Sequence, residues 1–338
     1  MGKPNIAVLG ATGVVGREIL KVIEETRLPY NELKLLSSAR SAGTQIEFMG
    51  EIFTVEEATP EAFVGINIVL ASAGASISKK LAHEIIRRGC VLIDNSSAFR
   101  MEKDVPLVIV GVNDNDLKKH KGIIANPNCS TSQLMLVLMP LHRHAVMKRL
   151  IVSTYQSVSG AGLAAINELT ENTKAVLNDE KYENKVFKKP IAFNVIPQID
   201  VFCDNGYTKE EMKIVKETRK IMHLDEDFPI TCTAARVPVY RGHSEAVTIE
   251  FHQHITAEIV KNLLSHAYGV KLIDNPDRFE YPTALDAACK NPVFVGRIRE
   301  DLAFKNGISL WCVADNLLIG AALNTVRIAH KLIEMKLY

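Results

Sequence analysis

NIAVLGATGVVGREILKVIEE (residues 5–25) is the stretch that decides the fold of this chain. It combines a short apolar strand, a glycine-rich turn and an amphipathic helix that we expect to begin at Val14. Gly10, Gly13 and Gly16 allow a tight turn and let the backbone approach a pyrophosphate, while the helix start offers N–H groups to the anion. Because a strand directly precedes the glycines and a helix directly follows them, the stretch predicts a dinucleotide-binding turn rather than a plain strand–helix connection.

The next strand, LKLLSS (33–38), ends where an NAD-binding fold usually carries an acidic residue for the ribose 2′-hydroxyl. Here the chain offers Ser38, Arg40 and Ser41 and no carboxylate, which suits the 2′-phosphate of NADP. The alternative is that Arg40 is a solvated loop residue. A further strand ends in Ser72-Ala73-Gly74, at the sheet edge where such folds bind ligands. The predicted cofactor-binding residues of this half are Gly10, Thr12, Gly13, Val14, Val15, Ser38, Arg40, Ser41, Ser72, Ala73 and Gly74.

The order of the patterns predicts an α/β chain of two domains. Apolar runs separated by helical segments indicate a parallel sheet covered on both faces, and EAVTIEFHQH (245–254) alternates with a period of two, as antiparallel strands do. We expect a Rossmann-like parallel-sheet domain at 1–127 and 317–338, and an α+β domain with a mixed, largely antiparallel sheet at 128–316. The apolar runs of the first domain lie at 66–73, 90–96, 107–112 and 123–127, and 181–208 reads as an irregular connection.

Composition excludes several classes of protein. Lys+Arg 40 against Asp+Glu 39 leaves a net charge of +1, which gives no electrostatic basis for binding nucleic acid or an anionic membrane. No uninterrupted apolar run reaches the length of a membrane span, and the N-terminus lacks a secretion signal. The six cysteines are scattered without a CxxC pair, which argues against a zinc site or a disulfide framework. We therefore expect a cytoplasmic protein that binds no metal.

NPNCSTS (126–132) places a cysteine between a predicted strand end and the apolar run QLMLVLMPL (133–141). Cys129 would then lie at a helix N-terminus, where unpaired N–H groups and the helix dipole favour a thiolate. The alternative is that Cys129 is a small buried hydrophobic residue. The stretch by itself leaves both interpretations open.

Other polar residues gain meaning only in combination. Arg100 ends NSSAFR (95–100), and Glu210 and Lys213 are three apart on a predicted helix at 209–222, so that surface roles are the default for all three. Arg236 lies seven residues before His243, which we expect in a Gly-His-Ser turn between two strands. Asp315-Asn316 reads as an N-cap pair.

Eight segments in the same order make the chain resemble the aspartate-β-semialdehyde dehydrogenase family, from Asn5 to the C-terminal helix. They are GATGVVG (10–16), SSARSAG (37–43), NSSAFR (95–100), NPNCST (126–131), YQSVSGAG (155–162), EEMK (210–213), RVPV (236–239) with GHSE (242–245), and ADNLLIGAA (314–322). The resemblance implies reversible, NADPH-dependent conversion of L-4-aspartyl phosphate to L-aspartate 4-semialdehyde and phosphate, in lysine, threonine, methionine and diaminopimelate biosynthesis. It also implies a homodimer or homotetramer, with dimerisation through the second domain.

The resemblance implies a role for each site residue. Cys129 would form an acyl thioester, His243 would act as acid and base, and Gln156 would orient the acyl group. Arg236 would bind the substrate carboxylate and Glu210 its ammonium, with Glu211 as the alternative for the ammonium. The phosphate ligands would be Arg100, Lys213 and Asn128, and the residues near the nicotinamide would be Ser159, Gly160 and Asn316.

Two other functions remain open at this point. An N-acylglutamyl-phosphate reductase would share the fold and the thioester, but its acylated substrate nitrogen would have no use for Glu210. A non-catalytic NADP-binding protein would keep the fold without the chemistry, and would be expected to lack the nucleophile or the base. Cys129 and His243 are both present, which disfavours the second alternative.

Overall fold

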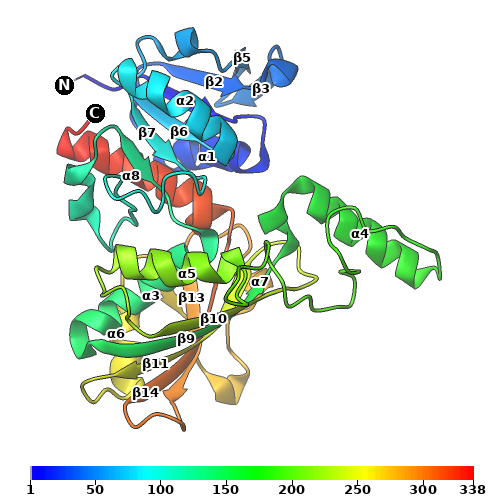
Figure 1. The fold of residues 1–338 in the computed structure, drawn as a ribbon, viewed down its shortest axis with the longest axis vertical. Coiled ribbons are helices and arrows are strands. Elements are labelled where there is room, and N and C mark those ends of the chain that lie inside the picture. Colours follow the sequence, from blue (N-terminus) through cyan, green and yellow to red (C-terminus); the bar gives the residue numbers. More distant parts are fainter. Residues whose placement is uncertain (1) are drawn as a thin grey trace. The chain divides into compact units, whose positions relative to one another are not determined.

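The computed structural model describes residues 2–338, which form two compact units. One unit comprises residues 2–128 and Ala321–Tyr338, and the other comprises Cys129–Gly320. The C-terminal helix α8 (Leu323–Met335) thus belongs to the same unit as the N-terminal strand β1 (Ile6–Leu9) (Figure 1). None of the helices within residues 2–338 is long and apolar enough to cross a membrane.

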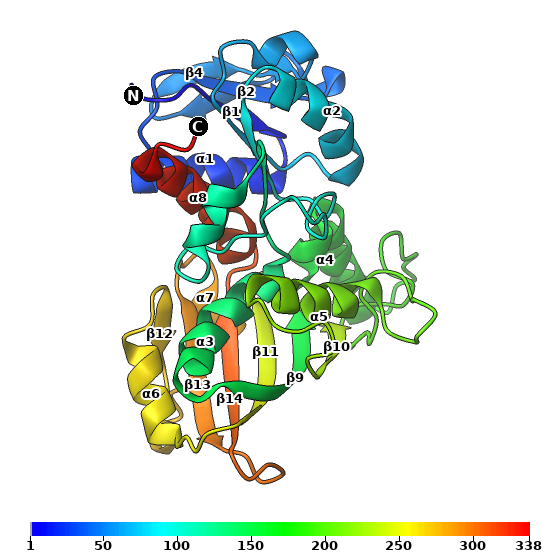
Figure 2. The same ribbon diagram turned by 60° about the vertical axis from the view of Figure 1, so that its left-hand side comes forward.

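The first unit is built on a six-stranded parallel sheet in the order β5-β2-β1-β6-β7-β8. Every residue of β1 is buried, as expected for a central strand with both faces covered. Helices α1 (Val14–Thr26) and α8 pack against one another, and α2 (Ala75–Arg87) lies on the other face of the sheet (Figure 2). The other strands are β2 (Leu33–Ser37), β5 (Glu56–Glu57), β6 (Ile68–Ala71), β7 (Val91–Asp94) and β8 (Ile123–Ala125), and β3 (Gln45–Phe48) pairs with β4 (Glu51–Thr54) separately.

The strand predicted at 107–112 is wrong. Leu107 alone makes an isolated bridge to Ala125, although residues 107–110 are buried. Side chains take the place of a neighbouring strand here. Asn324 accepts from the Val110 N–H at 3.0 Å and donates to the Val108 carbonyl at 2.8 Å. Because Asn324 of α8 makes both hydrogen bonds, these two buried backbone groups are paired although the segment is not a strand of the sheet.

The second unit contains a mixed six-stranded sheet in the order β10-β9-β11-β14-β13-β12, which confirms the predicted sheet type. The β10–β9 and β12–β13 pairs are parallel and the three central pairs are antiparallel. Helices α3, α5 and α6 pack on one face of it (Figure 2). The elements are α3 (Cys129–Ala145), β9 (Met147–Gln156), α4 (Leu163–Leu177), α5 (Lys209–Ile221), β10 (Ile230–Arg236), β11 (His243–Phe251), α6 (Ala257–Ser265), β12 (Val270–Leu272), α7 (Ala284–Ala287), β13 (Val293–Glu300) and β14 (Gly307–Ala314).

Residues 181–208 contain no regular helix or strand, as predicted, yet they are anchored. The buried Glu168 of α4 accepts hydrogen bonds from three consecutive backbone N–H groups, of Lys185, Val186 and Phe187, at 2.6–3.0 Å. Asn172, one turn later on α4, accepts from the Ala192 N–H at 2.9 Å. Two polar side chains therefore replace the missing ladder hydrogen bonds of this connection.

Candidate active site

The glycine turn after β1 forms one wall of a cavity in the first unit. Gly10 has φ +87°, and a Cβ there would lie 2.9 Å from the Ser72 Oγ. A Cβ on Gly16 would lie 2.2 Å from the Gly10 carbonyl oxygen. Helix α1 begins at Val14, as predicted, with Gly13 as its N-cap residue. These glycines are therefore required for the turn to fold tightly between the strand and the helix.

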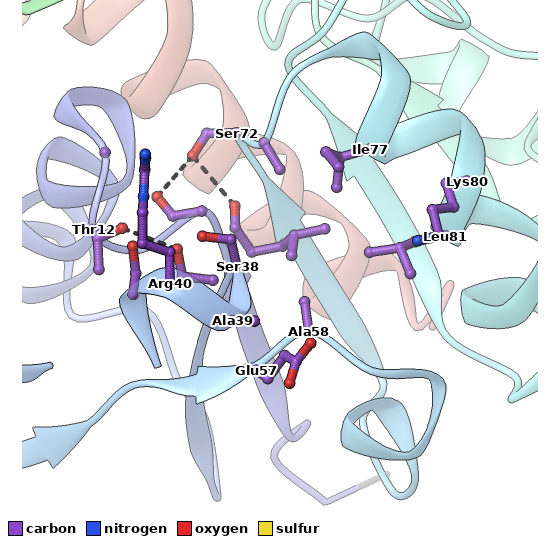
Figure 3. A pocket seen from close by; sticks show the side chains of 16 residues that line it. Thr12, Ser38, Ala39, Arg40, Glu57, Ala58, Ser72, Ile77, Lys80 and Leu81 are labelled. Atoms are coloured by element: carbon purple, nitrogen blue, oxygen red, sulfur yellow. Dashed lines mark hydrogen bonds between the residues drawn. The ribbon is translucent and has the colours of Figure 1, made fainter. Parts of the chain in front are cut away.

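The cavity has a volume of about 430 Å³ and lies at the carboxyl ends of β1, β2 and β6. Figure 3 shows Arg40 beside Thr12 and Ser38, on the opposite side of the cavity from Lys80. Within this wall the Thr12 and Ser37 hydroxyl groups lie 2.9 Å apart. The predicted cofactor residues that line the cavity are Gly10, Thr12, Gly13, Ser38, Arg40, Ser41, Ser72 and Ala73.

Three of the cofactor residues predicted in the first half of the chain do not line this cavity. Val14 and Val15 form the first turn of α1, and Gly74 is the N-cap of α2 with φ +82°. Conversely, Lys80 and Glu57 line the cavity and were not predicted. Lys80 lies one turn after Ile77, which also lines the cavity. Residues three apart on a helix share a face, so the two side chains of α2 point to the same side.

In the second unit, Cys129 is the first residue of α3. It is partly exposed, whereas Cys90, Cys232 and Cys312 are buried, so the interpretation of Cys129 as a buried hydrophobic residue is wrong. Gly320 lies directly against it, because a Cβ on Gly320 would come within 2.4 Å of the Cys129 Cβ. Any larger residue at position 320 would displace the cysteine.

His243 is completely buried and is the first residue of β11 rather than part of a turn. Its Nδ1 accepts a hydrogen bond from the Ser157 N–H at 3.1 Å. Because a backbone N–H can only donate, the neutral imidazole carries its proton on Nε2, and this Nε2 has no hydrogen-bond partner within residues 2–338. Burial, with Arg236 nearby, lowers the pKa of His243 to about 3, so the ring is neutral at pH 7.

Arg236, the last residue of β10, is also buried, and its Nη1 donates to the Ser157 carbonyl at 2.7 Å. Burial lowers the pKa of Arg236, and this shift is opposed by Glu210 and Cys129, so that Cys129 lies within electrostatic range of the guanidinium. Gly160 lies against both side chains. A Cβ at this position would be 3.1 Å from the Arg236 Nη1 and 3.2 Å from the His243 Nε2.

Glu210 and Lys213 form a largely buried pair rather than the solvated pair that their spacing suggests. The Lys213 Nζ lies 2.9 Å from Glu210 and 3.0 Å from Asp200, and the Glu210 side chain is 6% exposed. Although burial opposes the change, Glu210 and Asp200 raise the pKa of Lys213, which is therefore charged. Glu210 also accepts from the Gln156 Nε2 at 3.1 Å. The first carboxylate of the EEMK segment thus lies among the predicted site residues.

The second carboxylate, Glu211, has a structural role. It forms a capping box with Thr208 at the start of α5, and its other oxygen accepts from the Ala234 N–H at 2.9 Å. Both oxygens are thus engaged with the backbone.

Ser157 was not predicted, yet it connects several site residues. Besides its contacts with His243 and Arg236, its Oγ donates to the Asn316 Oδ1 at 3.1 Å. The same Oδ1 accepts from the Ser159 Oγ at 3.2 Å and from the Gly242 N–H at 3.0 Å. Asp315 caps the following turn, as predicted, through the Leu317 and Leu318 N–H groups. The sequence could not predict this role for the serine of YQSVSGAG, because its contacts with His243 and Arg236 use the backbone N–H and carbonyl, which every residue except proline carries.

The two remaining phosphate candidates belong to the first unit. Arg100 is 7% exposed, so it is not a surface arginine. Its Nε donates to the Asn126 carbonyl at 2.9 Å and its Nη2 to the Asn95 carbonyl at 2.8 Å. These contacts fix the plane of the guanidinium. Asn128 is buried immediately before Cys129.

Within residues 2–338 no group of three or more His, Cys, Asp or Glu side chains could hold a metal ion.

The comparison with protein families covers most of the chain. Residues 5–120 match the semialdehyde dehydrogenase NAD binding domain and residues 138–319 match the semialdehyde dehydrogenase dimerisation domain. The aspartate-semialdehyde dehydrogenase of Bacillus subtilis is 52% identical over 341 residues, with 98% of each chain covered. That of Aquifex aeolicus is 49% identical, again with 98% of each chain covered.

Solved structures agree with these relatives. Aspartate semialdehyde dehydrogenase II of Vibrio cholerae complexed with ASA has a TM-score of 0.96 and 44% identity, and 99% of each chain is covered. The enzyme of Candida albicans with NADP has a TM-score of 0.78 and 25% identity, covering 99% of this chain and 100% of that one. The fold, the order of the site segments and the full-length similarity lead to one conclusion: this chain belongs to the aspartate-semialdehyde dehydrogenase family.

Proposed function

We propose that this chain catalyses the reversible, NADP-dependent conversion of L-4-aspartyl phosphate to L-aspartate 4-semialdehyde and inorganic phosphate, through a thioester on Cys129. The observation that carries the proposal is the environment of this cysteine. Cys129 is partly exposed at the N-terminus of a 17-residue helix, and it lies within electrostatic range of the buried Arg236. The helix N-terminus and a nearby cation both favour the thiolate, which is the nucleophilic form.

The residues of the second unit divide the chemistry between them. The Cys129 thiolate attacks the acyl carbon, and the C–O bond to phosphate breaks with its electron pair leaving on phosphate. NADPH, when bound, supplies the hydride that reduces the acyl group. Collapse of the resulting hemithioacetal forms the aldehyde and returns the electron pair to the sulfur. Backbone N–H groups at the start of α3 would stabilise the oxyanion. His243 would act as acid and base: its ring, which is neutral at pH 7, takes up a proton from solvent, passes that proton to the phosphate as the C–O bond breaks and becomes neutral again, and it removes the proton in the reverse direction.

Charged side chains would select the substrate. Arg236 would bind the α-carboxylate and Glu210 the α-ammonium, since Glu211 is bound to backbone N–H groups at the start of α5 and in β10, whereas Glu210 contacts the site residues Gln156 and Lys213. Gln156, held by Thr154 at 3.1 Å, would orient the acyl group. A carboxylate that pairs with a free ammonium group favours a substrate with a free amino group over an N-acylated one, because the acylated nitrogen has no positive charge. The proposed phosphate ligands are Lys213, Arg100 and Asn128, and those near the nicotinamide are Ser159, Gly160 and Asn316.

The Cys129→Ser variant should bind NADP+ like the wild type and lose turnover by about 10³-fold or more, because an alkoxide forms far less readily than a thiolate at neutral pH. The measurement is NADP+ reduction with the semialdehyde, with and without phosphate, together with fluorescence titration of NADPH. Cys289→Ser is the matched control, since Cys289 is exposed and has no proposed role. Wild-type turnover by Cys129→Ser would exclude the thioester.

The Arg236→Lys variant should raise the KM for the semialdehyde about 10-fold or more, because a point charge cannot replace two hydrogen bonds to a carboxylate. Steady-state kinetics with the semialdehyde varied at saturating NADP+ measures this change. The KM for NADP+ should stay close to the wild-type value. An unchanged KM for the semialdehyde would remove Arg236 from the carboxylate site.

The glycine turn and Arg40 would bind NADP in the first unit. The cavity suits a dinucleotide because Gly10 in its wall has no side chain, and a Cβ there would meet Ser72, so the backbone itself faces the cavity and can approach a pyrophosphate closely. The pyrophosphate would lie against the start of α1, at Thr12, Gly13, Val14 and Val15, and the 2′-phosphate would lie against Ser38, Arg40 and Ser41. Gly74 would contribute through the backbone at the start of α2, beside Ser72 and Ala73.

Replacing Arg40 by Ala should weaken NADP+ binding about 10-fold while leaving NAD+ binding almost unchanged, because only NADP+ carries the 2′-phosphate that the guanidinium would bind. Titration of both cofactors against the variant checks this. Arg17→Ala is the control, since Arg17 is exposed on α1 outside the cavity. Equal losses for the two cofactors would contradict the role of Arg40.

The assembly and location of the protein belong to the same proposal. Ile151 and Tyr155 of β9 are 38% and 37% exposed, while the residues that alternate with them are buried. This apolar surface and the match to a dimerisation domain support a homodimer, or a homotetramer built from two of them. Light scattering on the full chain should give at least twice its 37.4 kDa mass, and a monomer would contradict the assembly. We also propose a cytoplasmic location, because the six cysteines are scattered along the sequence without the spacing of a disulfide framework.

A further inference from the structure

Asn324 of α8 is a completely buried amide that the proposed mechanism does not use. Its Oδ1 accepts from the Val110 N–H at 3.0 Å, and its Nδ2 donates to the Val108 carbonyl at 2.8 Å. The same Nδ2 makes a second hydrogen bond, to the Asn126 Oδ1 at 2.6 Å. Because a backbone N–H can only donate, the contact with Val110 sets which end of the amide is the oxygen. The nitrogen end therefore faces Asn126.

The contact with Asn126 begins a chain of side-chain amides that runs in one direction. Asn126 directly follows β8 and is completely buried. Since its Oδ1 accepts from Asn324, its Nδ2 is free to donate, and the acceptor is the Asn95 Oδ1 at 2.9 Å. Asn95 directly follows β7, and its Nδ2 donates to the carbonyl of Ala71, the last residue of β6, at 2.8 Å. A backbone carbonyl can only accept, so the two ends of the chain agree on the orientation of every amide between them.

The guanidinium of Arg100 is held by the backbone of two members of this amide chain. Its Nε donates to the Asn126 carbonyl at 2.9 Å, and its Nη2 donates to the Asn95 carbonyl at 2.8 Å. Asn95 and Asn126 each lie one residue beyond the last paired residues of β7 and β8, Asp94 and Ala125. The contact between their side chains continues the pairing of the two segments beyond the sheet. The amide chain therefore fixes the two carbonyl groups that orient the guanidinium.

We propose that Asn324 is a positioning residue for phosphate binding, because it orients the amides of Asn126 and Asn95, whose carbonyl groups hold Arg100. The inference rests on the proposed function, which makes Arg100 a phosphate ligand. Thr325, the next residue of α8, donates from its Oγ1 to the Asn95 Oδ1 at 2.8 Å, so that α8 contacts the amide chain at two points. A guanidinium binds phosphate through two parallel hydrogen bonds, and a rotation of its plane weakens both.

Asn113 offers a matched control, because it makes equivalent backbone contacts with the same segment. Its Oδ1 accepts from the Ile109 N–H and its Nδ2 donates to the Leu107 carbonyl, both at 2.9 Å. The Nδ2 also donates to Asp116 at 2.8 Å, which is not part of the amide chain. Replacing either asparagine by aspartate keeps the acceptor and removes the donors, so both changes should destabilise the segment, and thermal unfolding measures this common effect. Only the change at Asn324 also disturbs the amide chain.

Nuclear magnetic resonance of the full-length protein with isotope-labelled arginine tests the positioning without any reaction. The Nε–H signal of Arg100, assigned by its loss in Arg100→Lys, should exchange slowly with solvent in the wild type, because the group is buried and hydrogen-bonded. In Asn324→Asp the exchange should be about 10-fold faster or more, whereas in Asn113→Asp it should stay within about twofold of the wild type. Equal exchange in the wild type and in folded Asn324→Asp would overturn the proposal, whatever reaction the chain catalyses.

Kinetics test the consequence for phosphate, and this arm alone depends on the proposed function. Asn324→Asp should raise the KM for phosphate about 10-fold, with the KM values for the semialdehyde and NADP+ within about twofold of the wild type. Asn113→Asp should leave all of them close to the wild type. Thr325→Val removes one donor to Asn95 with little change of shape, so it should raise the KM for phosphate about threefold, and it tests the amide chain even if Asn324→Asp does not fold. An unchanged KM for phosphate, or an equal rise of every KM, would overturn the role in phosphate binding.

Discussion

The backbone N–H and carbonyl of one buried residue, Ser157, hold together the proposed catalytic cluster of the second unit. Its N–H donates to the His243 Nδ1, and its carbonyl accepts from the Arg236 Nη1. The first contact selects the tautomer of the base, and the second fixes the guanidinium plane. Because both contacts use main-chain atoms at the end of β9, the sheet itself sets this geometry. The rigidity of a strand end, rather than any side-chain rotamer, therefore aligns the base and the arginine.

Opposite charges lie close together in this cluster. Arg236 and Lys213 are the cations, Glu210 and Asp200 are anions beside them, and the proposed Cys129 thiolate would be a further anion within range of Arg236. His243 is neutral because burial and Arg236 both disfavour its cationic form. A neutral ring can donate from Nε2 without adding a charge to a site that must already hold a phosphorylated substrate. Since a nearby cation and a helix N-terminus both stabilise a thiolate, the same balance serves the nucleophile.

Close backbone approach recurs in both units. Gly10 lies against Ser72 beneath the cofactor cavity, Gly160 lies against Arg236 and His243, and Gly320 lies against Cys129. A methyl group would come within 2.9 Å of Ser72 at Gly10 and within 2.4 Å of Cys129 at Gly320, so that a neighbour would have to move, and at Gly160 it would pack tightly at 3.1–3.2 Å. The recurrence has a common cause, since ligand sites at strand ends are built from backbone segments that meet more closely than side chains allow.

Local sequence determined the parts of this protein that depend on local physics. The glycine turn, the helix that begins at Val14, the cysteine at a helix start and the spacing of Glu210 and Lys213 could all be predicted, because each depends on residues a few positions apart. Eight ordered segments then identified the family, and the comparisons confirmed it.

Tertiary structure decided what depends on residues distant in the chain. Residues 107–112 are not a strand, because the side chain of Asn324, more than 200 positions away, pairs with the Val110 N–H and the Val108 carbonyl in place of a neighbouring strand. The sequence also could not predict that the Glu210–Lys213 pair is largely buried or that Ser157 contacts His243 and Arg236, because both depend on packing between elements far apart in the chain. Glu245 is the sharpest case. A glutamate on a strand reads as a charged surface residue, whereas complete burial in the sheet raises the pKa of this one to about 8, because its charged form is disfavoured away from water.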